Sequence, residues 1–164
     1  MTASPVDLDA FRRAFRRHAA GVAIVTVLEP DGAPAAFTAT SVASLAAVPP
    51  MATFNMARSA SAWPAVASAT HLVLHMLGAR NRALAERMAG PRGSRFDGVG
   101  WRPGPGGAPV LDGVTAWMGG RILERFEVHE SAIVALRVDE GALGEADAPL
   151  LYHERSYRTP GDVV

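Results

Sequence analysis

The chain has 164 residues with 16 arginines, 16 acidic residues, no lysine and no cysteine, so its formal charge is zero. This length suits one domain with a hydrophobic core of its own. Without cysteine the chain forms no disulfide, thiolate metal site or thiol nucleophile, and without lysine it forms no Schiff base or Walker A phosphate site. The neutral charge argues against broad binding to nucleic acid. No run approaches the ~18 consecutive apolar residues that indicate a membrane span.

Two arginine pairs near the start of the chain raise the alternative of an export signal. Arg12-Arg13 and Arg16-Arg17 precede an apolar run, as in twin-arginine signals. That run is short, and its second half is β-branched, as in a strand. Asp7 and Asp9 also lie where the basic region of a signal lacks acids. We therefore expect a cytoplasmic protein.

Hydrophobic spacing predicts the elements in chain order. A helix over residues 7–18 is indicated by Leu8, Phe11 and Phe15 at three- and four-residue spacing, with Asp7 as its N-cap. The elements expected after it are a strand at 22–28, a turn at 29–32, an extended segment at 35–45, a strand at 51–56, a helix at 59–68, a strand at 71–77, a helix at 79–89, a surface loop at 90–107, strands at 114–128 and 131–138, and a last strand at 149–157.

Six or seven strands joined mainly by short turns, with few helices and no repeat, favour an antiparallel barrel over a parallel α/β sheet. No linker divides the chain. We therefore expect a mainly β protein with flanking helices, in which residues 1–164 form a single domain with a core from about residue 8 to 158.

The histidines do not indicate a metal site. His129-Glu130 and His153-Glu154 begin like a zinc-protease motif, but neither is followed by a second histidine one helical turn later. The five histidines share no spacing. We therefore predict no metal.

A stretch of small and hydroxylated residues follows the first turn. It reads Phe37-Thr-Ala-Thr-Ser-Val-Ala-Ser44, with hydroxyls at Thr38, Thr40, Ser41 and Ser44. Such hydroxyls, beside an accessible main chain, can bond a ribityl chain, a phosphate or the edge of a flat heterocycle. The alternative is a barrel strand that faces solvent.

A second polar segment, Asn55-Met-Ala-Arg-Ser-Ala-Ser61, follows a strand and begins a helix. Ser59 or Ser61 could cap that helix, or the free N–H groups and Arg58 could bind an anion there. Arg95, in the long loop, is a third candidate anion contact. Its alternative is an ordinary solvated arginine.

In their order along the chain, these segments resemble the flavin reductase family, whose members are reductase partners in two-component monooxygenases. The resemblance extends from Phe11 to about Tyr157, nearly the whole chain. The matching segments are Phe11-Arg-Arg-Ala-Phe-Arg-Arg-His-Ala-Ala-Gly-Val-Ala-Ile-Val-Thr26, Asp31-Gly-Ala-Pro34, Phe37-Thr-Ala-Thr-Ser41, Ser44-Leu-Ala-Ala-Val-Pro-Pro50, Arg95-Phe-Asp-Gly-Val-Gly-Trp101, Gly107-Ala-Pro-Val-Leu-Asp-Gly113 and Pro149-Leu-Leu-Tyr-His-Glu-Arg-Ser-Tyr157.

The resemblance implies a split-barrel flavin-binding fold, an antiparallel Greek-key barrel that pairs into a homodimer. It implies FMN or FAD near the dimer interface, NADH or NADPH as hydride donor, and release of reduced flavin to a separate flavin-dependent monooxygenase. By matching position, the residues implied to contact the flavin are Phe37, Thr38, Thr40 and Ser41, the loop of Asn55, Met56, Ala57, Arg58, Ser59 and Ser61, and, near the phosphate or AMP end, Ala89, Gly90 and Arg95. The nicotinamide-contacting histidine of the family, the implied catalytic residue, falls on His129, and its late tyrosine falls on Tyr157.

The chain departs from the family pattern in three places. His75-Met-Leu77 replaces Asn-Val-Leu, which would put an imidazole near the flavin. Residues 58–62 lose the second arginine and the threonine of an Arg-Ser-Ser-Arg-Thr-like loop. Glu127-Val-His129 replaces Gly-Asp-His, which keeps the histidine but loses the glycine and the acid.

Two functions remain open at this point. Hydride transfer between a nicotinamide and a flavin needs close stacking but no obligatory side-chain acid or base, and a histidine at the rim can orient the nicotinamide. The retained His129 therefore favours a flavin reductase, with NADH slightly favoured because no basic cluster is aimed at a 2′-phosphate. The altered loops favour a non-catalytic flavin-binding protein for storage or sensing, and fold alone does not decide between them.

Overall fold

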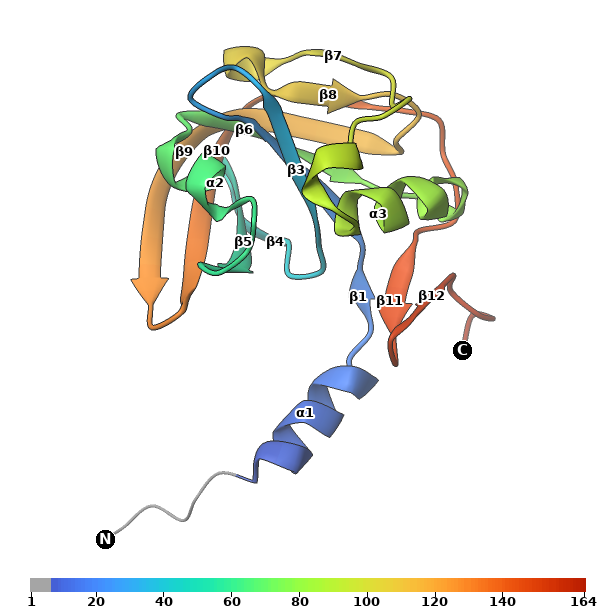
Figure 1. Cartoon of the computed structure of the whole chain (residues 1–164). Coiled ribbons are helices and arrows are strands. Elements are labelled where there is room, and N and C mark those ends of the chain that lie inside the picture. Colours follow the sequence, from blue (N-terminus) through green and yellow to red (C-terminus); the bar gives the residue numbers. More distant parts are fainter. Residues whose placement is uncertain (1–6) are drawn as a thin grey trace, which may run out of the picture.

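A computed structural model describes residues 7–164 of the chain (Figure 1). Its helices and strands, in chain order, are α1 (Leu8–Arg17), β1 (Ala20–Gly21), β2 (Ala23–Leu28), β3 (Pro34–Ala39), β4 (Ala43–Ala47), β5 (Pro50–Ala57), α2 (Trp63–Ser68), β6 (His71–Met76), η1 (Ala79–Asn81), α3 (Arg82–Ala89), η2 (Arg92–Ser94), β7 (Trp101–Pro103), η3 (Pro105–Gly107), β8 (Pro109–Leu111), β9 (Ala116–Val128), β10 (Ser131–Leu143), β11 (Leu151–His153) and β12 (Ser156–Arg158), where η marks a short 3₁₀ helix.

The main sheet closes on itself as a barrel. Its seven strands are antiparallel and lie in the order β3-β2-β6-β9-β10-β5-β4. The two edge strands, β3 and β4, are separated in the chain only by residues 40–42, a span of roughly 14 Å at most. The sheet must therefore curl until its edges meet. Ser41, in this connection, ties it to β5, because its Oγ accepts from the N–H of Asn55 at 2.9 Å and donates to the Asn55 carbonyl at 3.1 Å.

The barrel interior holds the larger of the hydrophobic clusters. Along β5, Ala52, Phe54 and Met56 point inward while Asn55 and Ala57 face out, which is the period-2 alternation of a strand with one buried face. α2 packs against this cluster through Ala65 and Val66. The interior is therefore a packed core and not a ligand chamber.

A second cluster lies outside the barrel, beneath α3 and the β7–β8 pair. It includes Ile24 of β2, Met88 of α3 and Leu111 of β8. α3 is held on β3 by Thr38, whose hydroxyl donates to the Ala85 carbonyl at 2.8 Å. This layer places the end of α3 beside the hydroxyl-rich end of β3.

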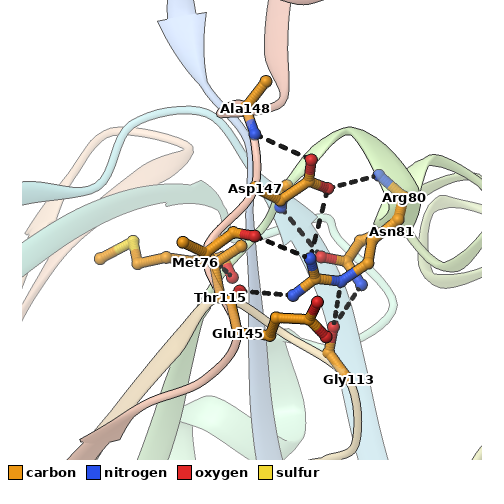
Figure 2. A network of polar contacts seen from close by, with 10 residues as sticks. Met76, Arg80, Asn81, Gly113, Thr115, Glu145, Asp147 and Ala148 are labelled. Carbon is orange, nitrogen blue, oxygen red and sulfur yellow. Dashed lines mark hydrogen bonds and ion pairs between the residues drawn. The ribbon is translucent and has the colours of Figure 1, made fainter.

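The start of α3 is anchored by a polar network (Figure 2). The Asp147 carboxylate accepts from the backbone N–H of Arg80 at 2.8 Å and from that of Ala148 at 2.8 Å. The Arg80 guanidinium donates to the carbonyls of Gly113, Glu145 and Ala146. These bonds tie the segment after β10 to η1, and so fix where α3 begins.

α1 stands apart from the barrel and projects from its lower end (Figure 1). Asp7 caps it as predicted, since its carboxylate accepts from the N–H groups of Asp9 and Ala10, both at 3.0 Å. No residue of α1 is buried, and Leu8, Phe11 and Phe15 are 55%, 54% and 64% exposed. None of the described helices in residues 7–164 is long and apolar enough to cross a membrane.

The predicted antiparallel barrel is confirmed, and several predicted elements need correction. The helix predicted at 59–68 begins only at Trp63, and the strand predicted at 131–138 continues to Leu143. Residues 35–45 do not form one segment, because the chain leaves β3 for the opposite edge of the sheet. The surface loop at 90–107 contains η2, β7 and η3, and β7 pairs with β8. The last strand is a hairpin, in which β11 and β12 are joined by Glu154 and Arg155 with φ of +47° and +62°.

Candidate functional site

Two open cavities adjoin one another where β3 leaves the sheet, and together we call them the recess. Their volumes are about 840 and 670 Å³, within the range usual for small-molecule and cofactor sites. Both are lined by Thr40, Tyr152 and Arg155. The recess is therefore framed by the end of β3 and by the β11–β12 hairpin.

Each cavity has one helical wall. α1 forms the wall of the larger cavity, whose lining residues are Phe11, Arg12, Phe15, Arg16, His18, Ala20, Thr40, Ser41, Asn55, Tyr152, Glu154 and Arg155. α3 forms the wall of the smaller one, lined by Thr38, Thr40, Arg82, Glu86, Ala89, Tyr152, Arg155, Ser156 and Tyr157. The structure thus brings six of the predicted cofactor contacts together in the recess: Thr38, Thr40, Ser41, Asn55, Ala89 and Tyr157.

The three hydroxyls of the predicted segment that line the recess, those of Thr38, Thr40 and Ser41, differ in their free hydrogen-bonding capacity. Ser41 is engaged in both directions by the backbone of Asn55. Thr38 donates to the Ala85 carbonyl, which leaves its oxygen free to accept. Thr40 is exposed, and its hydroxyl has no hydrogen-bond partner among residues 7–164. Thr40 is therefore the hydroxyl most available to a ligand.

The recess also contains four arginines that the sequence pattern did not indicate as cofactor contacts: Arg12 and Arg16 of α1, Arg82 of α3, and Arg155. Arg82 bonds Glu86 through its Nε at 2.9 Å and lies 5.9 Å from the Tyr157 ring centroid. Arg155 makes no side-chain hydrogen bond or ion pair to any residue in the described range. In the sequence, Arg82 looks like half of a surface i,i+4 pair, and Arg155 lies within residues 149–157, whose pattern predicts one continuous strand and gives no sign of the turn.

The environment of Tyr157 keeps its hydroxyl protonated at neutral pH. Burial raises the pKa of the phenol, the charges of Glu86 and Tyr152 raise it further, and Arg82 opposes them. The phenol is thus a neutral hydrogen-bond donor on the wall of the recess.

Arg95 is not a solvated arginine. It is buried, and three of its five N–H donors are taken by the Ala36 carbonyl at 2.6 Å, the Gly90 carbonyl at 3.0 Å and the Ser61 hydroxyl at 3.1 Å. It therefore joins β3, the end of α3 and the loop after β5. Burial, and then the nearby charge of Arg92, lower the pKa of the guanidinium.

Arg58, His129 and Ala57 lie together at the tip of the β9–β10 hairpin. β10 pairs with β5 so that Ser131 lies opposite Ala57. Arg58 forms an ion pair with Glu127 at 2.9 Å, and its Nη1 donates to the His129 carbonyl at 3.2 Å. His129 is exposed, with φ of +51°. This group is linked to the recess through β5, by way of Asn55.

The remaining predicted contacts lie elsewhere. The side chains of Phe37 and Met56 pack in the barrel core, and Ser44 lines a separate apolar cavity of about 640 Å³. Ser59 is exposed in the turn after β5. The interpretation of Ser59 or Ser61 as a helix cap is wrong, because α2 begins at Trp63 with Ala62 as its N-cap and no capping side chain.

The structure also corrects the expectation for His75. The ring is completely buried, where Nδ1 lies 3.1 Å from the Ile24 carbonyl and Nε2 accepts from the Leu111 N–H at 3.0 Å. Burial lowers the pKa of His75 from 6.5 to about 4. The imidazole is thus a neutral structural group, and it lines neither cavity of the recess. Among residues 7–164, no group of three or more His, Asp or Glu side chains could hold a metal ion.

An antiparallel barrel with a polar, arginine-flanked recess beside the end of β3 is a candidate cofactor-binding barrel. A family model for a flavin reductase like domain matches residues 15–161 of the chain. The chain therefore belongs to the flavin reductase family, which confirms the family and fold class that the sequence predicted.

Individual proteins that are similar to this chain also have names of flavin reductases or oxidoreductases. An NADH:FMN oxidoreductase of Rhodococcus erythropolis is 39% identical over 155 residues, covering 92% of this chain and 80% of that protein. The reductase component of a flavin-dependent trigonelline monooxygenase of Acinetobacter baylyi is 30% identical, covering 91% of this chain and 48% of that protein. The crystal structure of a flavin reductase domain protein from Arthrobacter sp. FB24 has a TM-score of 0.91 and 49% identity, covering 95% of this chain and 97% of that one.

Proposed function

We propose that this protein is an NADH-dependent flavin reductase that uses FMN and supplies reduced flavin to a separate monooxygenase. The observation that carries the proposal is the recess, where hydroxyl, tyrosine and arginine side chains from four parts of the chain converge. Family membership supports the activity, and the names of the relatives support FMN, NADH and the monooxygenase partner.

The residues of the recess fit a flavin nucleotide. Arg82 and Arg155 supply positive charge for a phosphate, and Thr38, Thr40 and Tyr157 supply hydrogen bonds for a ribityl chain or ring edge. Arg95 would act behind the recess, where it holds β3 and the end of α3 in place. A bound flavin would supply the hydride-accepting chemistry, and the protein would orient the two nucleotides.

His129 is the proposed contact for the nicotinamide. It lies exposed at the tip of the hairpin, free of any side-chain hydrogen bond to a described residue, so its ring can orient the carboxamide of the donor. We expect His129→Ala to impair NADH use while leaving flavin affinity within a few-fold. Loss of flavin binding with an unchanged hydride step would contradict this role.

The direct test is oxidation of NADH and NADPH at 340 nm by the purified protein, with FMN or FAD added and the flavin-free rate subtracted. We expect flavin-dependent turnover with NADH and FMN as the preferred pair. Quenching of flavin fluorescence without turnover would instead establish the flavin-binding protein that the altered loops favour.

We further propose that the reductase is a homodimer and works in the cytoplasm, where NADH is regenerated. Two apolar surfaces support a second copy: the exposed face of α1 with Leu8, Phe11 and Phe15, and the apolar cavity whose lining includes Leu143, which is 89% exposed. Apolar patches of this kind mark association surfaces. Recovery of the native protein from a periplasmic fraction would contradict the location.

A further inference from the structure

The turn that carries His129 needs support from outside the hairpin. Val128 pairs with Ser131, so His129 and Glu130 form a two-residue turn. His129 has φ of +51°, a left-handed conformation that costs a residue with a side chain on the order of 1 kcal/mol or more. Such a conformation persists only where surrounding contacts hold it.

Arg58, at the end of β5, supplies these contacts. Its backbone N–H donates to the Glu130 carbonyl at 2.8 Å, and its Nη1 donates to the His129 carbonyl at 3.2 Å. Both carbonyls of the turn are therefore bonded by one residue. Its Nη2 forms the ion pair with Glu127, two residues before His129 on β9.

The guanidinium of Arg58 is held in the orientation that these bonds require. Its carbon lies 6.0 Å from the centroid of the Trp63 ring. Its Nε is buried and has no hydrogen-bond partner among the described residues, so the polar contacts of the group are all made by the two outer nitrogens that face the hairpin. Arg58 lines neither cavity of the recess.

We propose that Arg58 and Glu127 form a clamp that positions His129 for the nicotinamide, an inference that rests on the proposed reductase function. Arg58 is the arginine that the altered loop at residues 58–62 keeps, and Glu127 is a position where the sequence departs from the family pattern, so the ion pair joins a retained residue to an altered one. The clamp gives the turn the support that its left-handed residue requires.

The clamp affects the binding of NADH and not the binding of the flavin. Because Arg58 acts through His129 and stays outside the recess, its loss should weaken docking of NADH while flavin affinity and the maximal rate persist. The alternative role, a direct flavin contact, predicts the opposite pattern. The ratio of KM for NADH to flavin Kd therefore separates the two.

The variants are chosen to separate charge from geometry. For Arg58→Met we expect KM for NADH to rise about three- to tenfold, with kcat and flavin Kd within about twofold. Arg58→Lys keeps a positive charge for Glu127, but one ammonium group cannot replace both outer nitrogens of the guanidinium. Its KM for NADH should therefore lie between those of the wild type and Arg58→Met. Glu127→Gln should act in the same direction, and adding it to Arg58→Met should bring little further change.

Arg121→Met is the matched control, since Arg121 is an exposed arginine on β9, the strand of Glu127, and forms an ion pair with Asp139 at 3.3 Å. It should leave all three constants unchanged. A flavin Kd that weakens more than KM for NADH in Arg58→Met, or a KM that does not change, would overturn the clamp.

A second readout tests the clamp without turnover. The ring resonance of His129, assigned in NMR spectra by its loss in His129→Ala, should shift in Arg58→Met and Glu127→Gln but stay in place in Arg121→Met. An unshifted ring would also overturn the clamp. If the wild-type protein oxidises no NADH with either flavin, the reductase function fails, whereas this spectroscopic test of the clamp still decides.

Discussion

At the scale of single residues, burial decides what a titratable side chain does. His75, on β6, is buried against β2 and β8. Its two ring nitrogens contact backbone groups, so the ring is neutral in the folded protein. Its pKa falls to about 4, whereas in the unfolded chain it returns to its ordinary value of 6.5. Between these two values the unfolded state binds the additional proton. The contribution of His75 to the free energy of unfolding is therefore fully present above about pH 6.5 and is lost as the pH falls toward 4.

The prediction is that acidification from pH 7 to pH 5 lowers the free energy of unfolding by about 2 kcal/mol through His75 alone. His75→Asn should reduce stability at pH 7, because it removes buried volume and contacts, but it should abolish this part of the pH dependence. Urea midpoints at the two pH values measure both effects. The control His153→Asn, at a half-buried position, should keep the wild-type difference, and a difference of unchanged size in His75→Asn would contradict the assignment.

At the scale of elements, the position of α3 depends on a close approach between two loops. A Cβ at Gly78 would lie 2.5 Å from the Asp147 carboxylate oxygen, the same oxygen that accepts from the Arg80 N–H (Figure 2). Only a residue without a side chain lets the segment after β10 reach η1. Because α3 forms a wall of the recess, this contact also shapes the candidate flavin site.

Gly78→Ala should therefore displace Asp147 and destabilise the fold by about 1–3 kcal/mol. Flavin affinity should fall with it, since the α3 wall loosens. Urea unfolding and fluorescence titration with FMN measure the two effects. Gly21→Ala is the matched control, because nothing lies within 4 Å of its added Cβ, and equal stability of the two variants would contradict the argument.

At the scale of the whole molecule, the monomer leaves the apolar face of α1 without a partner. That face is also a wall of the recess, through Phe11 and Phe15. An amphipathic helix with no buried residue gains most of its stability from packing, which the described chain does not provide. A second copy that covers this face would complete both the helix and the site.

We therefore expect light scattering to give about twice the 17.2 kDa of the chain. Phe15→Asp should shift the protein toward the monomer and weaken flavin binding, because a charge on the buried face of an interface is costly. Ala10→Asp, on the polar side of the same helix, should leave the dimer intact. A wild-type monomer would refute the homodimer, and a dimer that survives Phe15→Asp would move the interface away from α1.

Much of this architecture was predictable because its causes are local. The helix at α1, its Asp7 cap and the strands β9 and β10 follow from spacing that a few neighbouring residues define, although β10 continues to Leu143, past the predicted end at residue 138. The order of short motifs predicted the family, and with it the barrel and the hydroxyl-rich end of β3. The break between β3 and β4 and the turn at Glu154 and Arg155 were missed, because composition continues smoothly across both.

The sequence by itself determined the class of fold, the family, and the residue types available to bind a flavin and a nicotinamide. Only the tertiary structure decided their roles, because these depend on partners far away in the chain. Arg95 is buried and bonded to the Ala36 carbonyl, and it therefore holds β3 in place. His75 is a neutral core group because its ring contacts the backbone of Ile24 and Leu111. Arg155 lines the recess. Desolvation and hydrogen bonding fix the charge and freedom of such groups, and neither exists until segments remote in the sequence meet.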